Sequence, residues 1–379
     1  MSTDPPSAPR SEAEDDRLDL YDYPLDPVRI AATPCAERDG ARLLVHDRET
    51  GRTSHGIFRD LASHLRRGDL LVLNDARVVP ARLRARRATG GEVEVLLHPT
   101  GGDGSGGDPG DPGSHGDEIV PALLRPSARL LAGEVLTLAD GRGDGLRLIV
   151  VDPPGGELRR VRIVGGLARA LELGELPLPP YIERDPEAPD AAAREEQDRE
   201  RYQTVFARVP GAIAAPTAGL HFTPRLLLQL AAAGVAATRI TLHVGPGTFL
   251  PVRSDRLSGH AMHEELYEIP EAAAAAIATA RAEGHRIIAV GTTTTRALES
   301  AVAADGSVRP GRARTRLMIR PPHRFRAIDG LVTNFHLPKT TLLALVAAFT
   351  GRERLLALYS EAAALGYRFY SYGDAMLLT

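Results

Sequence analysis

Short apolar runs, cut by Gly, Pro and Asp, fill the chain from Asp69 to about Val164. Segments such as LLVLND, GEVEVLLHP, EVLTLAD and LRLIVVD alternate apolar with polar positions or are wholly apolar, and turn residues recur about every ten positions. This spacing is typical of a small β-barrel or β-sandwich. Residues 100–118 carry no large apolar side chain, so we expect a flexible insertion in a hairpin loop there.

The N-terminal part shows different patterns. Two β-like runs in ARLLVHDRETGRTSHGIF flank the polar turn ETGRT, which predicts two strands. In FRDLASHLRRG, the residues Phe58, Leu61 and Leu65 share one helical face, and Gly68 marks a stop. Residues 1–18 are polar and acidic, so we expect a disordered tail and not a secretory signal.

In the second half of the chain, helix-like runs such as EAAAAAIATARAEG alternate with buried-strand runs such as HRIIAVG. This alternation is the signature of an α/β domain. Residues 183–202 are acidic and Ala-rich and predict a solvated connection into a helix. We therefore predict a multi-domain α/β protein. An α/β catalytic domain is built from both chain ends (19–68 and 166–379), with a small antiparallel β-barrel domain (69–165) inserted into it.

Composition narrows the class of protein. Of 379 residues, 43% are hydrophobic and 25% charged, which is ordinary for a globular chain of two or three domains. The sequence contains no run of about eighteen apolar residues, so it predicts no membrane-spanning helix. The single cysteine, Cys35, excludes an internal disulfide and a thiolate-rich metal site, so we expect it to be a packing residue in a cytoplasmic protein. The net charge of −3 argues against a general nucleic-acid binder but not against local basic patches.

The basic residues are almost all arginines. Lys and Arg total 46, and the only lysine is Lys339. Arginine therefore serves wherever any cation will do, and a single remaining lysine indicates a place that needs a compact, titratable charge. Because Lys339 lies in TNFHLPK beside Asn334 and His336, ahead of the helix-like run TTLLALVAAF, we predict that this loop belongs to an active site.

Other polar residues follow strand-like runs, where ligands bind in open α/β sheets. APTAGLHFTP supplies Pro216, Thr217, Gly219 and His221 in a tight loop before a helix start, which suits an anion or is an ordinary turn. ITLHVGPGTF supplies further candidates after an apolar strand, namely His243, Gly245, Gly247 and Thr248.

Three more segments add candidates. In IIAVGTTTTRALES, Thr292, Thr293, Arg296 and Glu299 suit a ribose or an anion at a helix start, although the threonines could simply cap the helix. SYGDAM places Tyr372 and Asp374 in a polar turn, and NDAR places Asn74, Asp75 and Arg77 at a strand end. The spacing His260-x-x-His263 matches no standard zinc site, so we predict no metal.

Two stretches are rich in arginine. They are residues 82–87 and residues 312–326. Arginines of this kind could contact the phosphates of a nucleic acid, or they could be ordinary solvated surface.

Taken in order, these segments resemble the S-adenosylmethionine:tRNA ribosyltransferase-isomerase family of queuosine biosynthesis. The matching stretches are LLVLNDARVVPARL, RYQTVFA, APTAGLHFT, LHVGPGTFLPV, VGTTTTRALES, TNFHLPKTTLLALVAAF and YRFYSYGDAM, spread from about residue 25 to 379. The resemblance implies an α/β domain with an inserted β-barrel. It also implies that S-adenosylmethionine serves as a ribosyl donor and co-substrate, with no permanently bound cofactor.

In the reaction that the resemblance implies, loss of the C5′ proton beside the sulfonium gives an ylide. The ylide attacks 7-aminomethyl-7-deazaguanine at the tRNA wobble position, and rearrangement expels adenine and methionine to leave epoxyqueuosine. His336, His221 and His243 are the candidates for base and acid, in no fixed order. Lys339 and Arg77 would contact an anion or the leaving group, Arg296, Thr292 and Thr293 the ribose or carboxylate, and Asp374 would orient a neighbour.

The sequence departs from the family pattern where RNA or the base would be read. Ala76 stands for a threonine in NDTRV, and Glu264 and Leu266 stand for serine and tryptophan in MHSEWYE. Two alternatives follow: a ribosyltransferase with another acceptor, and a non-catalytic RNA- or nucleotide-binding homologue. For the leading hypothesis we expect a cytoplasmic monomer that binds tRNA and S-adenosylmethionine and no membrane.

Overall fold

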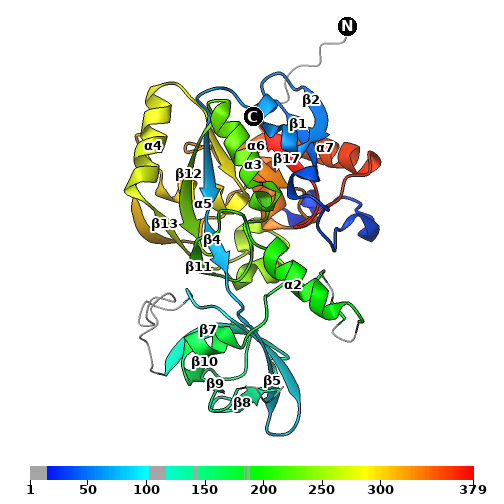
Figure 1. The fold of residues 1–379 in the computed structure, drawn as a ribbon, viewed down its shortest axis with the longest axis vertical. Coiled ribbons are helices and arrows are strands. Elements are labelled where there is room, and N and C mark those ends of the chain that lie inside the picture. Colours follow the sequence, from blue (N-terminus) through cyan, green and yellow to red (C-terminus); the bar gives the residue numbers. More distant parts are fainter. Residues whose placement is uncertain are drawn as a thin grey trace.

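The computed structural model describes residues 15–101, 117–139, 141, 143–156, 158–182, 184–185 and 188–379. An α/β domain that contains both ends of the described chain sits above a smaller β-barrel (Figure 1). Most of the predicted insertion at 100–118 and most of the predicted tail at 1–18 lie outside the described residues.

One large mixed sheet forms the centre of the α/β domain. In spatial order its described strands are β15 (Gly311–Thr315), β13 (Glu265–Ile269), β12 (Ala236–Leu242), β3 (Leu70–Asn74), β14 (Ile287–Val290), β16 (Gly330–Asn334), β17 (Ala375–Leu378), β1 (Arg42–His46) and β2 (Thr53–Ile57). The central strands β12, β3, β14 and β16 run parallel to one another. Their carboxyl ends therefore meet at one edge of the sheet.

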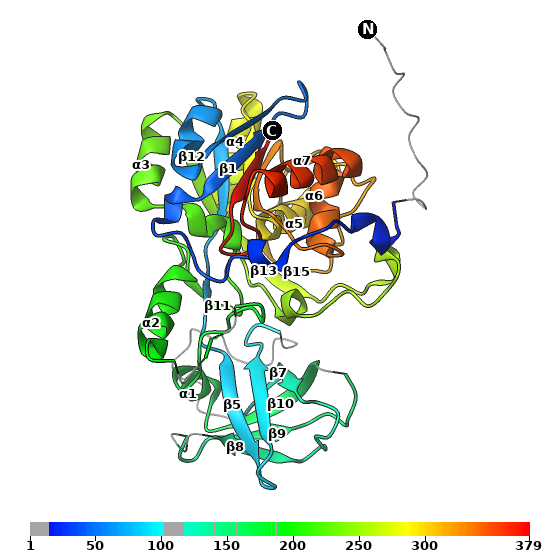
Figure 2. The same ribbon diagram turned by 90° about the vertical axis from the view of Figure 1, so that its right-hand side faces the viewer.

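Both faces of this sheet are buried, as expected for parallel strands with near-continuous apolar sequences. Because side chains alternate along a strand, Leu70 and Val72 belong to one hydrophobic cluster and Leu71 and Leu73 to another. The first cluster includes residues of α4, α5, α6 and α7, and the second includes residues of α3. Figure 2 shows α3 on one side of the sheet and α6 and α7 on the other.

The α-helices are α1 (Leu167–Glu172), α2 (Ala191–Arg201), α3 (Pro224–Ala232), α4 (Glu271–Ala282), α5 (Thr292–Ala301), α6 (Thr341–Thr350) and α7 (Arg352–Ala364). The 3-10 turns are η1 (Leu18–Tyr21), η2 (Pro27–Arg29), η3 (Arg38–Gly40), η4 (Phe58–His64), η5 (Thr217–His221), η6 (Pro246–Phe249) and η7 (Leu257–Gly259). Across the described residues, no helix is both long enough and apolar enough to cross a membrane.

The smaller domain is a closed antiparallel barrel. Its strands, in spatial order, are β10 (Leu158–Val164), β7 (Glu118–Arg125), β6 (Glu92–Leu97), β5 (Arg82–Arg87), β8 (Val135–Leu138) and β9 (Arg147–Val150). In β5, Leu83 and Ala85 are buried while Arg84 and Arg86 face outward, which is the alternation that a barrel wall requires. This agrees with the predicted fold class.

Three local predictions need correction. The predicted barrel begins at residue 69, but β3 pairs with β12 and β14 in the large sheet, and the first strand of the barrel is β5. The predicted tail extends to residue 18, but Asp16 is buried and accepts hydrogen bonds from Ser258. The helical run at Phe58 is a 3-10 turn, for which a spacing of three between buried Phe58 and Leu61 is appropriate.

Two short strands connect the domains. After β3 the chain forms β4 (Ala76–Val78) and enters the barrel, and it returns through α1 and α2 to β11 (Val209–Ala212), which pairs with β4 in parallel. β3 and β4 run toward the barrel, so the carboxyl edge of the sheet faces it (Figure 1).

Candidate active site

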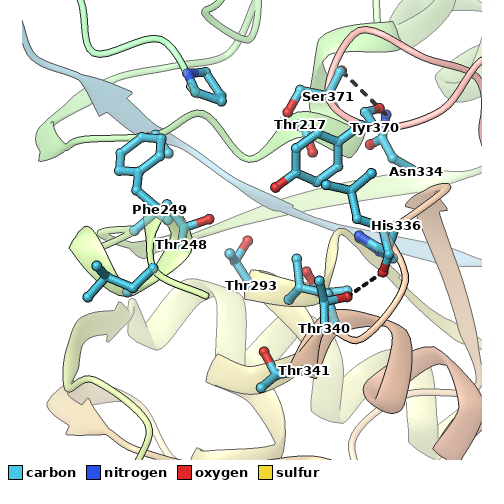
Figure 3. Close-up of a pocket in the computed structure, with 18 of the residues that line it drawn as sticks. Thr217, Thr248, Phe249, Thr293, Asn334, His336, Thr340, Thr341, Tyr370 and Ser371 are labelled. Atoms are coloured by element: carbon cyan, nitrogen blue, oxygen red, sulfur yellow. Dashed lines mark hydrogen bonds between the residues drawn. The ribbon is translucent and has the colours of Figure 1, made fainter. Parts of the chain in front are cut away.

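A cavity of about 540 Å³ lies at the carboxyl edge of the parallel strands (Figure 3). Its walls come from the loops after β12, β14 and β16, from η5, from the loop that contains Tyr370 and from the segment between the barrel and α2. None of the described residues of the barrel strands lines it. Its size suits a drug-sized or nucleoside-sized ligand.

Half of the predicted site residues line this cavity. They are Pro216, Thr217, Gly247, Thr248, Thr292, Thr293, Arg296, Asn334, His336 and Lys339. They come from four segments that are far apart in sequence, and the parallel strand order brings these segments to one edge.

Asn334, the last residue of β16, is buried in the cavity wall. Its Nδ2 donates to Nε2 of His221 at 3.1 Å, to the carbonyl oxygen of Tyr370 at 3.0 Å and to that of Ser371 at 3.4 Å. Because Nδ2 faces these acceptors, Oδ1 lies on the other side of the carboxamide, and it has no hydrogen-bond partner in the protein. A buried acceptor of this kind is costly unless a ligand or water satisfies it.

His336 is held by its backbone and by one ring nitrogen. Its amide donates to the hydroxyl of Tyr359 at 2.9 Å, and its carbonyl accepts from the hydroxyl of Tyr23. Nε2 lies 2.8 Å from Oγ1 of Thr333, which leaves Nδ1 as the ring nitrogen available to a substrate. Burial lowers the pKa of His336 to about 3, so the imidazole is neutral near pH 7.

His221 lies behind Asn334 and does not line the cavity. Its ring packs against Phe58 with centroids 5.0 Å apart. Burial, with a smaller contribution from Arg368, lowers its pKa to about 3. A neutral imidazole whose Nε2 accepts from Asn334 carries its proton on Nδ1, so the observed contact orients Asn334.

Arg296 lies in the first turns of α5 and forms a buried ion pair with Glu265 of β13. Its Nε donates to the carbonyl of Leu317 at 3.0 Å, and Glu265 also accepts from the amide of Gly245 at 3.1 Å. Nη2 of Arg296 is buried without a protein partner in the lining of the cavity. This fork can therefore receive a carboxylate or hydroxyl of a ligand.

The start of α5 is fixed by Asn74 at the end of β3. Nδ2 of Asn74 donates to the carbonyl of Leu242 at 3.0 Å and to Oγ1 of Thr293 at 3.3 Å, and its Oδ1 accepts from the amides of Ala76 and Leu242. Asn74 itself is buried outside the cavity lining. It thereby ties the end of β3 to the end of β12 and to the start of α5.

Lys339 lies at the rim, two residues before α6 begins. Its Nζ is 2.7 Å from Oδ2 of Asp22, and both side chains are about half exposed. A cation beside a helix N-terminus is opposed by the helix dipole, so the position is not explained by helix stability.

Lys339 and Tyr370 are the non-glycine residues with positive φ among the described residues, at 56° and 76°. Both line the cavity, and strained backbone tends to occur at functional sites.

Several predicted residues near the domain junction lie outside the cavity lining. Asp75 is buried and accepts from Oγ1 of Thr241 at 2.6 Å and from Arg208 at 3.0 Å, whereas Arg77 on β4 is exposed. His243 is buried beside Gly211. Gly219 and Gly245 are the remaining members of this group. A Cβ on Gly219 would lie 2.8 Å from Phe206, and one on Gly245 would lie 3.2 Å from His98, so close packing explains both.

Three other predicted residues hold backbone segments. Glu299 accepts from the amides of Arg326 and Ala327. The hydroxyl of Tyr372 donates to Asp198 at 3.1 Å. Asp374 accepts from the amides of Arg42 and Arg368, at 2.8 and 2.7 Å. All three lie outside the cavity lining.

The cavity also has an aromatic part, which was not among the predicted site residues. Tyr181, Tyr202, Phe249 and Tyr370 all line it. Tyr370 immediately precedes the SYGDAM segment, but Tyr181 lies in the connection after the barrel, where no sequence pattern singles it out. The segment with the His-x-x-His spacing also lines the cavity, through His260, His263 and Glu265.

The arginines of residues 82–87 face carboxylates. Arg82 lies near Glu94, Arg84 near Glu175, Arg86 near Glu92 and Arg87 near Glu134. This stretch is therefore largely neutralised within the protein. In the second stretch, Arg314 and Arg316 lie 3.4 and 3.3 Å from Glu264. Among the described residues, no group of three or more His, Cys, Asp or Glu is arranged to hold a metal ion.

Together, the fold and the site define a two-domain α/β protein with an inserted β-barrel and a nucleoside-sized cavity at the carboxyl edge of its sheet. Residues 18–378 match the family model described as queuosine biosynthesis protein.

Curated relatives agree with this match. A protein of Anaeromyxobacter dehalogenans (strain 2CP-C), named S-adenosylmethionine:tRNA ribosyltransferase-isomerase, is 51% identical over 364 residues, covering 96% of this chain and 99% of that protein. A protein of the same name from Thermus thermophilus is 48% identical, covering 95% and 99%. The crystal structure of the S-adenosylmethionine tRNA ribosyltransferase of Thermotoga maritima matches with a TM-score of 0.52 and 33% identity, covering 95% of this chain and 100% of that one. The chain belongs to this family of queuosine biosynthesis proteins, which confirms the family resemblance seen in the sequence.

Proposed function

We propose that this chain transfers and rearranges the ribosyl moiety of S-adenosylmethionine onto 7-aminomethyl-7-deazaguanine at the wobble position of tRNA. The products are epoxyqueuosine in the tRNA, adenine and methionine. Membership of the family supports the overall reaction. The observation that carries the proposal at the level of the site is a cavity lined by a neutral imidazole, His336, and by two residues with unpartnered buried polar atoms, Oδ1 of Asn334 and Nη2 of Arg296.

S-adenosylmethionine has groups that suit these atoms. Its carboxylate needs a cationic donor, and Nη2 of Arg296 is a buried donor whose other contacts are already fixed by Glu265 and Leu317. Its amino and hydroxyl groups need acceptors, which Oδ1 of Asn334 and the threonines at the start of α5 supply. The co-substrate would therefore lie against the carboxyl edge of the sheet.

We assign the role of base to His336. In the first step the C5′–H bond breaks, the proton moves to Nδ1, and the electron pair stays on carbon beside the sulfonium. A base must be unprotonated to accept a proton, and burial keeps His336 in that form near pH 7. His221 and His243 do not line the cavity, and this favours His336 among the three histidines.

Lys339 and its ion pair with Asp22 suit a role at the rim. An ion pair between half-exposed groups contributes little stability, so Lys339 can exchange Asp22 for an anionic group of a substrate at small cost.

We also propose that the protein acts as a monomer in the cytoplasm, where tRNA is used.

The test uses the purified chain, S-adenosylmethionine and a tRNA that carries the deazaguanine base. Mass spectrometry of the nucleosides and chromatography of the small molecules should find adenine, methionine and the modified nucleoside in equal amounts. Adenine without modified tRNA would indicate another acceptor. Absence of all three products would contradict the proposal and favour a non-catalytic binding role.

A further inference from the structure

Two tyrosines from distant parts of the chain meet in the cavity wall. Tyr181 follows Pro179 and Pro180 in the segment between the barrel and α2, and Tyr370 lies in the loop before β17. Their ring centroids are 4.2 Å apart, with an angle of 56° between the ring planes. Both rings line the cavity. Figure 3 shows the ring of Tyr370 reaching into the space between Asn334 and Phe249.

The backbone of Tyr370 is held on both sides. Its amide donates to the carbonyl of Phe335 at 2.9 Å, and its carbonyl accepts from Asn334 and from the amide of Gly373. Its φ of 76° is unusual for a bulky residue. The protein thus keeps a strained conformation that fixes where this ring lies, which a residue serving only as core filling would not require.

Tyr181 is anchored by its neighbours. The buried residue Ile182 donates its amide to the carbonyl of Pro179, and Ile182 packs with Leu178 and Tyr202 in one hydrophobic cluster. Burial raises the pKa of the phenols of Tyr181 and Tyr370, so both rings are uncharged near neutral pH. A neutral aromatic pair is a suitable surface for a flat heteroaromatic base.

The proposed reaction involves two flat bases, the adenine of S-adenosylmethionine and the deazaguanine of the tRNA. The position of the tyrosine pair indicates which of them it contacts. The unpartnered Nη2 of Arg296 and the start of α5 belong to the wall formed by the sheet and α5, where the small co-substrate would bind. Tyr181 comes from the segment that returns from the barrel. If the small co-substrate occupies the wall of the sheet and α5, the wall that carries Tyr181 remains for a base tethered to the RNA.

We propose that Tyr181 and Tyr370 form the stacking surface for the wobble base of the tRNA when that base is turned out of the anticodon loop. This inference rests on the proposed function. Unpaired bases of single-stranded RNA loops are commonly recognised by stacking on aromatic side chains, and one such contact is worth enough to change affinity on the order of tenfold to a hundredfold.

The kinetic test compares Tyr181→Leu and Tyr370→Leu with the corresponding Phe variants. The Leu variants should raise the KM for tRNA on the order of tenfold or more, while the Kd for S-adenosylmethionine measured by calorimetry stays near the wild-type value. The Phe variants should restore most of the lost tRNA affinity. Tyr367→Leu, which removes a fully buried ring outside the cavity, serves as the control for general effects of ring loss.

A second readout does not depend on turnover. The chain contains no tryptophan, so Tyr181→Trp introduces a single tryptophan, which can be excited at wavelengths that the tyrosines do not absorb. An anticodon stem-loop that carries the deazaguanine base should quench its fluorescence, and S-adenosylmethionine alone should not. Quenching by S-adenosylmethionine alone, or a raised Kd for it in the Leu variants, would overturn the inference. Unchanged tRNA KM in an active enzyme would overturn it as well. A wild-type protein that releases no adenine would instead count against the proposed function, while the fluorescence result still decides the stacking surface.

Discussion

Nε2 of His221 lies 3.1 Å from Nδ2 of Asn334, although the two residues are 113 positions apart in the sequence. This contact fixes the direction of the Asn334 carboxamide, because only the amide nitrogen can donate to His221 and to the carbonyls of Tyr370 and Ser371. His221 is therefore a positioning residue. Because it holds Nδ2 of Asn334 on its own side, Oδ1 lies on the other side of the carboxamide, without a partner in the protein.

The first prediction concerns this pair. Asn334→Asp replaces the donor by a second acceptor that faces three acceptors, so we expect weaker binding of S-adenosylmethionine and a loss of about 2–3 kcal/mol in unfolding free energy. His221→Gln keeps an acceptor at the same place and should retain more activity than His221→Leu. Calorimetric titration and steady-state kinetics measure both effects. Equal activity of the Gln and Leu variants would show that the contact does not orient Asn334.

The second prediction separates binding from stability at two ion pairs whose carboxylates are buried. Arg296 pairs with Glu265 beside the cavity, and Arg286 pairs with Asp69 at the opposite edge of the sheet, where Arg286 is adjacent to the first residue of β14. Arg296→Gln and Arg286→Gln should both destabilise the fold, by about 3 kcal/mol or more, because each leaves a buried carboxylate without its partner. Only Arg296→Gln should raise the Kd for S-adenosylmethionine. A similar rise in both variants would refute a direct contact.

The third prediction concerns the only lysine. Lys339→Arg keeps a cation within reach of Asp22 but replaces a compact ammonium by a planar fork, so activity should fall although the ion pair can re-form. Because the pair is half exposed, Lys339→Asn should change the unfolding free energy by less than about 1 kcal/mol. Full activity of Lys339→Arg would show that any cation suffices at this position.

The fourth prediction is a pH dependence of stability. Burial lowers the pKa of His98, His221 and His336 to about 3, below their ordinary value of 6.5. The unfolded chain takes up protons below pH 6.5 and the folded protein does not. The contribution of these histidines to the free energy of unfolding is therefore fully present above pH 6.5. It decreases toward pH 3, by up to about 1.4 kcal/mol per pH unit for each histidine.

Denaturant unfolding at several pH values across this range checks the trend. In His98→Leu the free energy of unfolding should decrease less steeply with falling pH, because one of the three histidines no longer contributes. This comparison separates the histidines from carboxylates that titrate in the same range. An identical slope in wild type and variant would show that His98 is not neutral in the folded state.

Part of this structure follows from simple rules of sequence. Polar residues after apolar strands predict a common site at the carboxyl edge, and Thr292, Thr293, Asn334 and His336 indeed line one cavity. The strand β3 was misassigned because a short apolar run such as LLVLN suits a barrel strand or a central parallel strand equally well. Only its pairing with β12 and β14 distinguishes the two.

Other features depend on contacts that no local pattern contains. The arginines of 82–87 suggest a phosphate-binding surface until Glu175 and Glu134 are brought against them by the fold. Glu299 and Asp374 have the residue types of a substrate site, but their carboxylates bind backbone amides of distant segments. Sequence alone could not separate such carboxylates from those that face the cavity.

His336 in its cavity is proposed to accept the proton whose loss starts the reaction. The most direct measurement is adenine release by His336→Asn, with wild type and His285→Ala as references. His285 precedes β14 at the edge of the sheet opposite the cavity. We predict that wild type and His285→Ala release adenine at similar rates, and that His336→Asn folds and binds S-adenosylmethionine but loses at least about a hundredfold in rate. Adenine release by His336→Asn at the wild-type rate would contradict the assignment of His336 as the base.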